Sequence, residues 1–485
     1  MYRPGYSLLV EYIDTNSMQV WAYTCTYMTH MCTSRCTQST YISSIIYSFM
    51  ELLKITEYNP WWDTGEVRKE LCPPYERRMI YKIISSFEVR SVTVLRGPRR
   101  TGKSTLLYQS IRYLLSKGID PEHILFFSFD DEKGTITDLL EEYKNVVLEK
   151  PFDKFKKLYV FLDEVHKCKN WSEQVKRYYD LYPNIKFILS GSVSFEIGTK
   201  ATVNLVGRTI ELILNPMSFG EYLSLKGIQV PSFGKPLKQF LLTEARIRPY
   251  FNHFLVTGGF PELVNEERKD RIKEYVLSSI VRRAVYGDLI HEGGISDPES
   301  MMALVRAIAE MPGILLNHDK LGSDIGRDRR TVSSYISRLE YSMIIRTLGN
   351  IRKSGISSSK KLRKGYPISS ALTFTFKGFE LEDRDLGRVV EVAVLNEINA
   401  EYFWRHRGNE VDFIIGNKGN VAVEVKLGKT RKIFFEQYGK IRDLKKAFVI
   451  SKQESGSGRA GSVKYQTVPV WALCAGAGVE DLRNE

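Results

Sequence analysis

The stretch from Val92 to Thr105 constrains this chain more than any other. It reads Val-Thr-Val-Leu-Arg-Gly-Pro-Arg-Arg-Thr-Gly-Lys-Ser-Thr, a short β-branched run followed by a glycine, four residues and Gly-Lys-Ser. An amphipathic helix pattern begins directly after it. A strand, a glycine-bearing turn and a helix in this order are the parts of a phosphate-binding loop. The sequence therefore predicts a nucleotide site at the start of a helix; the alternative is a degenerate loop kept for packing.

The two glycines of the loop allow a backbone curl in which successive N–H groups point into one hollow, and the helix N-terminus adds its positive end. In such a loop the lysine reaches the β- and γ-phosphates and the serine hydroxyl binds Mg²⁺. We therefore expect ATP and Mg²⁺ as ligands. The expected nucleotide-binding residues are Gly97, Pro98, Arg99, Arg100, Thr101, Gly102, Lys103, Ser104 and Thr105.

An acidic pair follows a second apolar run, from Leu158 to Leu162. Hydrolysis of ATP needs Mg²⁺ and a group that deprotonates the attacking water. Asp163 at the strand end is expected to hold Mg²⁺ opposite Ser104, and Glu164 is expected to act as general base beside the γ-phosphate. Lys103 is the second expected catalytic residue. At the end of a later run, Ser190 and Ser192 are candidate sensors of the γ-phosphate. Arg208 is either an arginine finger or part of a structural salt bridge.

Short apolar runs alternate with helical patterns over the first half of the chain. The runs lie at 92–96, 124–129, 158–162, 186–189 and 209–214. Strands that are apolar on both faces and alternate with helices indicate a parallel sheet covered on both sides. The predicted fold class is α/β, with a P-loop NTPase domain over residues 50–217. A mainly helical region without a chemical signature follows over 218–299.

Residues 300–376 suggest a winged-helix segment. Helices are expected at 303–310, 320–326 and 329–340, and the turn near Gly326 fits a helix-turn-helix. The second helix of that motif carries Arg329, Arg330, Tyr335 and Arg338. A basic cluster follows among Ser and Gly, which is either a solvated loop or a flexible wing that contacts phosphates: Arg352, Lys353, Lys360, Lys361, Arg363 and Lys364.

The charge balance favours an acidic partner. The chain has 485 residues and a formal net charge of +13, most simply explained by nucleic acid, although a basic protein without such a partner stays possible. The six cysteines form no pair of CxxC units, which predicts reduced thiols, a cytoplasmic location and no zinc site. No apolar run has the length of a membrane span. Residues 1–49 are expected to be a disordered extension or to precede a true start at Met50.

Several motifs together resemble prokaryotic, especially archaeal, AAA-like P-loop ATPases. They are Gly97–Thr105, Leu162-Asp163-Glu164, Leu189–Ser192, Leu205–Arg208 and Asn215–Phe219. Asn59-Pro60-Trp61-Trp62 is similar to the start of such proteins, and the resemblance extends to about Ile450. It implies ATP binding and hydrolysis in the cytoplasm. It also implies a C-terminal region with a winged helix and a restriction-endonuclease-like end.

Four residues near the C-terminus match the spacing of PD-(D/E)xK nucleases, with Val411 in place of the proline. Asp412 and Glu424 on a predicted hairpin would share a divalent metal, Lys426 would orient water, and Glu391 on the preceding helix would add a ligand. The alternatives are a surface ion pair and an inert fold that binds DNA or docks a protein. The nuclease-like domain is expected at 377–452, and 453–485 as a Gly/Ser-rich tail.

The function predicted from these features is an AAA-like ATPase that acts on or with DNA, and that forms a homo-oligomer in one version of this hypothesis. A nucleotide-gated signalling or protein-docking switch with an inert nuclease-like domain is the alternative from another class. An ATPase coupled to an active metal-dependent nuclease is the third. No membrane association is expected.

Overall fold

The computed structural model describes residues 55–130, 134–191, 205–231, 235–291, 297–351, 362–416, 419–428 and 433–477. The chain divides into two compact units, Met1–Glu57 and Tyr58–Glu485, and the second unit contains both sheets and the helices packed on them. The predicted extension at 1–49 lies outside the described residues. So do Ser192 and four members of the basic cluster, Arg352, Lys353, Lys360 and Lys361.

A parallel sheet of five strands forms the first half of the second unit, in the order β2-β3-β4-β1-β5. Its strands are β1 (Val92–Arg96), β2 (Ile124–Ser128), β3 (Leu158–Asp163), β4 (Ile185–Gly191) and β5 (Thr209–Ile213). The α/β P-loop-type sheet expected from the sequence is confirmed. The expectation of apolar faces on both sides is wrong for β5, whose residues alternate between exposed and partly exposed because it is an edge strand.

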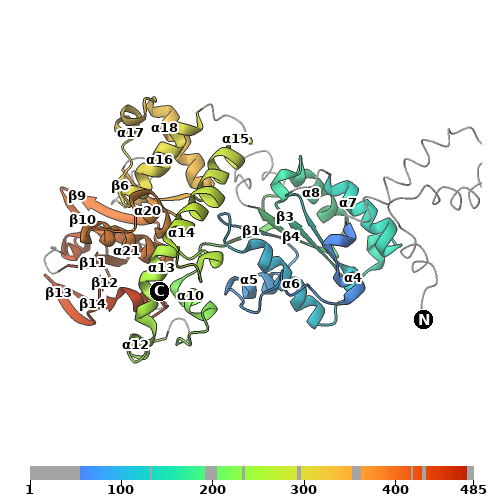
Figure 1. The fold of residues 1–485 in the computed structure, drawn as a ribbon, viewed down its shortest axis with the longest axis horizontal. Coiled ribbons are helices and arrows are strands. Elements are labelled where there is room, and N and C mark those ends of the chain that lie inside the picture. The colour runs from blue at the N-terminus through green and yellow to red at the C-terminus, as the bar shows by residue number, and fades with distance from the viewer. Residues whose placement is uncertain are drawn as a thin grey trace, which may run out of the picture. The chain divides into compact units, whose positions relative to one another are not determined.

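Helices cover both faces of this sheet. They are α5 (Met79–Ser86), α6 (Lys103–Ser116), α7 (Ile136–Glu142) with its π-helical continuation η2 (Tyr143–Leu148), and α8 (Trp171–Leu181). In Figure 1, α5 and α6 lie on one side of the labelled strands, and α7 and α8 on the other. The apolar faces of α5 and α6 share a buried core with Leu95, Phe126 and Phe161 of the strands.

The region after β5 is helical, as predicted. Its elements are α10 (Phe219–Leu225), α11 (Leu237–Leu241), α12 (Glu244–Ile247), α13 (Phe251–Thr257), α14 (Lys269–Tyr275), the π-helix η7 (Val276–Asp288) and α15 (Leu289–His291). π-Helical segments of this kind are uncommon and often mark functional sites. The buried side of η7 packs in one apolar cluster with Leu304 and Ile308 of the next helix.

Three helices and three short strands then follow. They are α16 (Pro298–Glu310), β6 (Ile314–Leu315), α17 (His318–Ile325), α18 (Arg329–Tyr341), β7 (Ile345–Asn350) and β8 (Arg363–Pro367). β8 pairs antiparallel with both β6 and β7. Tyr335, named with three arginines on the second helix of the predicted motif, is buried with Val332, Ile336 and Leu339, because the spacing of these residues forms one apolar stripe.

The predicted basic loop is shorter than expected at its C-terminal end. Arg363 and Lys364 do not belong to a flexible wing, since both lie in β8, paired in register with Gly349 and Leu348 of β7. Arg363 binds Glu340 of α18 at 2.7 Å, and Lys364 is buried. The backbone hydrogen bonds of a paired strand fix the positions of its charged residues. A count of basic residues in the sequence does not reveal this pairing.

A second sheet of nine strands joins the last two predicted domains, in the order β13-β14-β12-β11-β10-β9-β7-β8-β6. The added strands are β9 (Tyr402–His406), β10 (Asn409–Ile415), β11 (Val421–Lys426), β12 (Lys446–Ser451), β13 (Gly456–Ala460) and β14 (Val463–Pro469). β7 pairs in parallel with β9. The boundary expected near residue 377 therefore crosses one continuous sheet.

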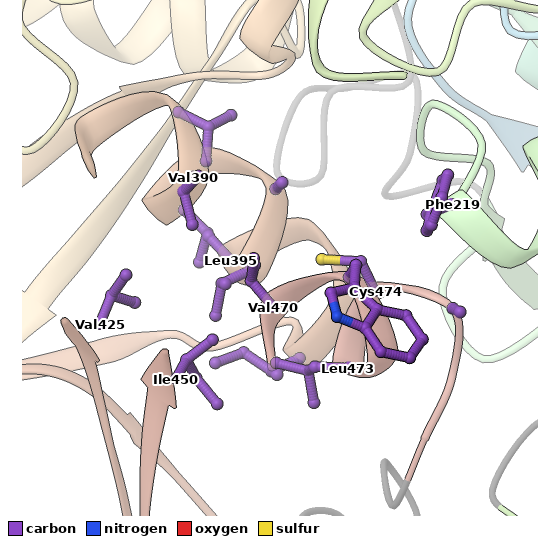
Figure 2. Close-up of a cluster of buried hydrophobic side chains, with 14 of the residues drawn as sticks. Phe219, Val390, Leu395, Val425, Ile450, Val470, Leu473 and Cys474 are labelled. Carbon is purple, nitrogen blue, oxygen red and sulfur yellow. The ribbon is translucent and has the colours of Figure 1, made fainter. Parts of the chain in front are cut away.

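The predicted C-terminal tail is wrong over 456–477. β13 and β14 form a hairpin there. α23 (Val470–Cys474) packs against α21 (Asp383–Ile398), and α21 in turn contacts α20 (Ser370–Lys377). Figure 2 shows a buried cluster whose labelled members are Phe219, Val390, Leu395, Val425, Ile450, Val470, Leu473 and Cys474. The Gly/Ser-rich composition of 455–461 obscured the strand, because a two-residue alternation is hard to detect in small polar residues.

Within the described ranges, no helix combines the length and the apolar character that a membrane crossing needs. Cys72, Cys168 and Cys474 are buried free thiols.

Candidate nucleotide site

The two glycines of the loop between β1 and α6 are required for different reasons. A Cβ on Gly97 would lie 2.3 Å from the carbonyl oxygen of Leu214, so no side chain fits there. Gly102 caps α6 with a φ of +92°, in the left-handed region that favours glycine. The sequence predicted both glycines because the loop backbone must curl. In the structure, Gly97 is required because the chain after β5 passes close to it.

Lys103, the first residue of α6, fills the curl of the loop. Its Nζ donates to the carbonyl oxygens of Gly97 at 3.1 Å and Pro98 at 3.0 Å. Burial lowers the pKa of Lys103, while the nearby charges of Glu164 and Asp163 oppose this lowering. The ammonium is thus desolvated and held beside the position where the loop would receive phosphate.

Arg77 supports the loop from outside and was missed by sequence reasoning. Its Nη1 donates to the carbonyl of Thr101 at 3.0 Å, and its Nη2 binds Glu221 at 2.7 Å. Glu221 also completes a capping box with Ser218 at the start of α10. Ser218-x-x-Glu221 is visible in the sequence as a helix start, but its arginine partner lies 144 residues away, so nothing local indicates the pair.

The predicted magnesium ligands lie together. Ser104 Oγ donates to Asp163 Oδ2 at 2.5 Å, and Ser190 Oγ donates to Asp163 Oδ1. Burial raises the pKa of Asp163, as does the charge of Glu164, and the two serine hydroxyls act against this rise. A hydroxyl beside a buried carboxylate fits the donor set that Mg²⁺ takes in nucleotide sites, with phosphates and water as further ligands. Ser190 was expected to sense the γ-phosphate, and its hydroxyl contacts Asp163.

Glu164 follows Asp163 in a strained backbone position. Its φ is +47°, which is uncommon for a residue other than glycine, and strain of this kind gathers at functional sites. His166 was not predicted, and its Nδ1 lies 3.3 Å from Glu164 Oε2. Burial lowers the pKa of His166, so that the imidazole is neutral near pH 7.

Arg208 lies away from its own nucleotide site. It precedes β5, and its carbonyl accepts from Val92 N at the amino end of the sheet, whereas the phosphate loop follows the carboxyl end of β1. Its guanidinium binds Asp180 of α8 at 3.2 Å. Of the two roles predicted for Arg208, this contact is the salt bridge.

Three of the predicted nuclease residues lie on neighbouring strands of the second sheet, and Glu391 lies on α21. Val425 N donates to Asp412 Oδ2 at 2.9 Å, Asp412 N donates to Glu424 Oε2 at 3.2 Å, and Lys426 pairs with Glu424. Glu391 accepts from Tyr366 at 3.0 Å. Burial, together with the charge of Asp412, raises the pKa of Glu391 to about 7 and that of Glu424 to about 8.

A lysine from another strand enters this carboxylate cluster. Lys364 of β8, whose side chain is 5% exposed, places its Nζ 2.5 Å from Glu410 Oε1 and 3.8 Å from Asp412 Oδ1. Among the described residues, no three His, Cys, Asp or Glu side chains are placed to hold a metal ion. The ammonium of Lys364 therefore lies beside Asp412, one of the two carboxylates predicted to share a metal. The role of Lys364 was missed because it lies on β8, far from the motif in the sequence. Glu410 was missed because it lies on β10 two residues before Asp412, at a position that the nuclease spacing does not include.

Comparison with known proteins identifies two segments. Residues 89–223 match the model of a family described as AAA domain, and residues 248–380 match a domain of unknown function, DUF8612. An uncharacterized protein of Haemophilus influenzae is 25% identical over 266 residues, which cover 54% of this chain and 63% of that protein. The uncharacterized protein MJ1544 of Methanocaldococcus jannaschii is 26% identical over 361 residues, covering 70% and 76%.

Solved structures give weaker likenesses. DnaA from Aquifex aeolicus with bound AMPPCP is 15% identical at a TM-score of 0.25, covering 56% of this chain and 92% of that one. Cdc6p from Pyrobaculum aerophilum is 12% identical at 0.25, covering 64% and 98%. TM-scores of this size establish no shared fold over these lengths. The family match, the strand order and the loop geometry together identify residues 89–223 as an AAA-type P-loop ATPase domain.

Proposed function

We propose that this chain hydrolyses ATP at the loop between β1 and α6. The observation that carries the proposal is the convergence of two segments: Lys103 and Ser104 at the start of α6 meet Asp163 and Glu164 at the end of β3. Bound Mg²⁺ would supply charge neutralisation for the phosphates. Lys103 moves its ammonium from two loop carbonyls to phosphate oxygens, and Glu164 accepts the proton of the attacking water. Ser104 and Asp163 would hold the Mg²⁺.

Two variants separate binding from turnover. Lys103→Ala removes the phosphate-binding ammonium, so nucleotide binding measured by calorimetry should be lost. Glu164→Gln keeps the shape of the site and removes the base, so ATP should still bind while hydrolysis falls about 10²- to 10⁴-fold. Tight ATP binding by Lys103→Ala, or unchanged turnover in Glu164→Gln, would contradict these roles.

A second proposal concerns the partner. The order α16-β6-α17-α18-β7-β8 is the helix and strand order of a winged helix, and it supports DNA binding through the start of α18. Arg329 and Arg330 are exposed there, and Asp328 caps the helix through the N–H groups of Arg330 and Thr331. Arg329 has only a loose ion pair with Asp319, at 3.5 Å with both side chains about 70% exposed.

The test is the salt dependence of DNA binding. Replacing Arg329 and Arg330 together with alanine should reduce the slope of log K against log salt by about 2, the loss of two phosphate contacts. The matched control is the double alanine variant of Arg68 and Lys69, which removes two exposed charges from the ATPase part. Equal slopes in both variants, or ATPase activity that responds to a protein partner but not to DNA, would favour the protein-docking switch.

We propose further that the carboxylate cluster around Lys364 is structural. Removing one member of a buried ion pair costs about 3–5 kcal/mol, because the remaining charges lose their partner. Lys364→Met should therefore lower the free energy of unfolding by about this amount. Lys377→Met is the control, since its pair with Asp385 is one-third exposed on the lysine side. Mg²⁺- or Mn²⁺-dependent DNA cleavage that is lost in Asp412→Asn would overturn the structural role and favour a nuclease.

A further inference from the structure

The phosphate loop carries an arginine that is already bound to a carboxylate. Arg99, two residues after Gly97, donates through Nε to Asp288 Oδ2 at 2.8 Å and through Nη2 to Asp288 Oδ1 at 2.5 Å. The side chains are 14% and 6% exposed. Two parallel bonds from one guanidinium are the geometry with which arginine binds a carboxylate or a phosphate. The loop thus holds an oxyanion of the chain itself.

That oxyanion lies within the electrostatic field of the nucleotide site. Burial lowers the pKa of Lys103 and of His166, and the charge of Asp288 acts against the lowering in both. The pKa of Arg99 is raised, first by its hydrogen bonds to Asp288 and also by the charge of Glu164. The charge of Asp288 therefore acts on the lysine that would bind phosphate, and the charge of Glu164 acts on Arg99.

Asp288 comes from a different part of the chain. It is the last residue of η7, whose Val276, Ile280, Val281 and Val285 are buried in the same apolar cluster as α16 and the inner stripe of α18. Interiors packed in this way transmit displacement, because side chains that interdigitate cannot move singly. A change at Asp288 would reach the helix whose exposed end carries Arg329 and Arg330.

We propose that Asp288 takes the place of a nucleotide phosphate in the ligand-free chain, and that Arg99 transfers from Asp288 to the γ-phosphate when ATP binds. This inference rests on ATP being the ligand of the site. The arriving phosphates repel the carboxylate and offer Arg99 oxygens of the same geometry. η7 then loses its ion pair with the phosphate loop. The conformation of the helical region therefore depends on which nucleotide is bound.

Binding affinities measure this exchange. Asp288→Asn removes the competing charge, so ATP should bind about five- to 20-fold more tightly, a coupling of ordinary size for two linked sites. ADP should gain less, since it lacks the phosphate that competes. Arg99→Ala should weaken ATP binding more than ADP binding.

A neighbouring pair supplies the control. Arg100 of the same loop binds Glu262 at 3.0 Å, but these side chains are 40% and 52% exposed. Glu262→Gln removes a carboxylate from the same helical region and should change ATP affinity less than twofold, because exposed pairs are screened by water. An equal effect of both variants would show a general charge effect and overturn the exchange.

Hydrogen exchange on the wild-type chain tests the same step without a substitution. Amides of 276–288 should lose protection when a non-hydrolysable ATP analogue is added, and should keep it with ADP. If the wild type binds no ATP, both the proposed function and this inference fail. If it binds ATP, but Asp288→Asn binds it no more tightly and η7 keeps its protection with the analogue, only the exchange between Asp288 and phosphate is refuted.

Discussion

At the scale of single residues, the chain places several ionisable groups in positions where water cannot stabilise their charge. Lys103 and Asp163 have their pKa values moved by burial in the nucleotide site, and Glu391 and Glu424 in the carboxylate cluster. In each place the compensating group belongs to the chain: loop carbonyls, serine hydroxyls or a buried lysine. Such groups are expensive to ionise, so they connect stability to pH.

The pH dependence follows from Glu424. Burial raises its pKa in the folded chain to about 8 from an ordinary 4.5, so the folded state binds more protons than the unfolded state between these values. Stability from this group is complete at low pH and is lost as pH rises from about 5 to about 8. Thermal unfolding should show a Tm that falls over this window in the wild type and falls less in Glu424→Gln.

The control for this experiment is Glu454→Gln, which replaces an exposed carboxylate in the same half of the chain. Its Tm should follow the wild-type curve. A Glu424→Gln curve parallel to the wild type would mean that Glu424 ionises freely in the folded chain.

At the scale of elements, the β2 edge of the first sheet is covered by side chains rather than by another strand. Asn59 donates through Nδ2 to the carbonyl of Phe126 at 2.8 Å and accepts from Phe126 N at 2.6 Å. Trp61 and Trp62 both donate to the carbonyl of Ile124, at 3.0 and 2.9 Å. An unpaired edge strand is a template for aggregation, so these residues protect β2. The Asn-Pro-Trp-Trp motif, which resembles the start of AAA-like P-loop ATPases, thus also has a structural role.

Asn59→Ala should therefore destabilise the ATPase part. It leaves a buried N–H and a buried carbonyl of Phe126 without partners, which costs about 1–3 kcal/mol for each group. Urea unfolding is the measurement, with Asp63→Ala as control, since Asp63 is exposed in the next turn. Exposed substitutions of this kind change stability by less than about 0.5 kcal/mol. Equal midpoints for the two variants would refute the protective role of Asn59.

At the scale of the whole second unit, α23 completes a large apolar core. Trp471 of α23 is 1% exposed, and its neighbours in the cluster come from α10, α13, α21, β11 and β12. Gly220 of α10 approaches the backbone of Ala475 so closely that a Cβ would lie 2.8 Å from its carbonyl oxygen. Segments that lie more than 200 residues apart in the sequence share this core.

A chain that ends at Gln453 should therefore fold poorly. It lacks β13, β14 and α23 and exposes the apolar faces of α21 and β12, so we expect loss of soluble protein or of cooperative unfolding. A chain that ends at Ala477 keeps every element of this packing and serves as the control. A soluble 453-residue chain with an unchanged Tm would mean that the C-terminal hairpin and helix add nothing to the core.

The sequence by itself determined the features that depend on neighbours along the chain. The phosphate loop, the strand that delivers Asp163 and Glu164, the stops of helices and the four nuclease-like positions are all set by short spacings. Backbone geometry makes such spacings meaningful, because a turn, a helix face or a strand face repeats every few residues. These elements lie where the sequence predicted them, within a few residues.

Only the tertiary structure decided which distant charges meet. Asp288 binds Arg99 across 189 residues, Arg77 reaches Glu221 across 144, and Lys364 enters the carboxylate cluster from a strand assigned to a loop. A charged residue is usually exposed to water, which stabilises its charge without a partner. A buried charge depends on its ion-pair partner, so burial determines which pairs affect stability. Burial is a property of the packed chain, so the Arg99–Asp288 pair and the Lys364 ammonium emerge only in the fold.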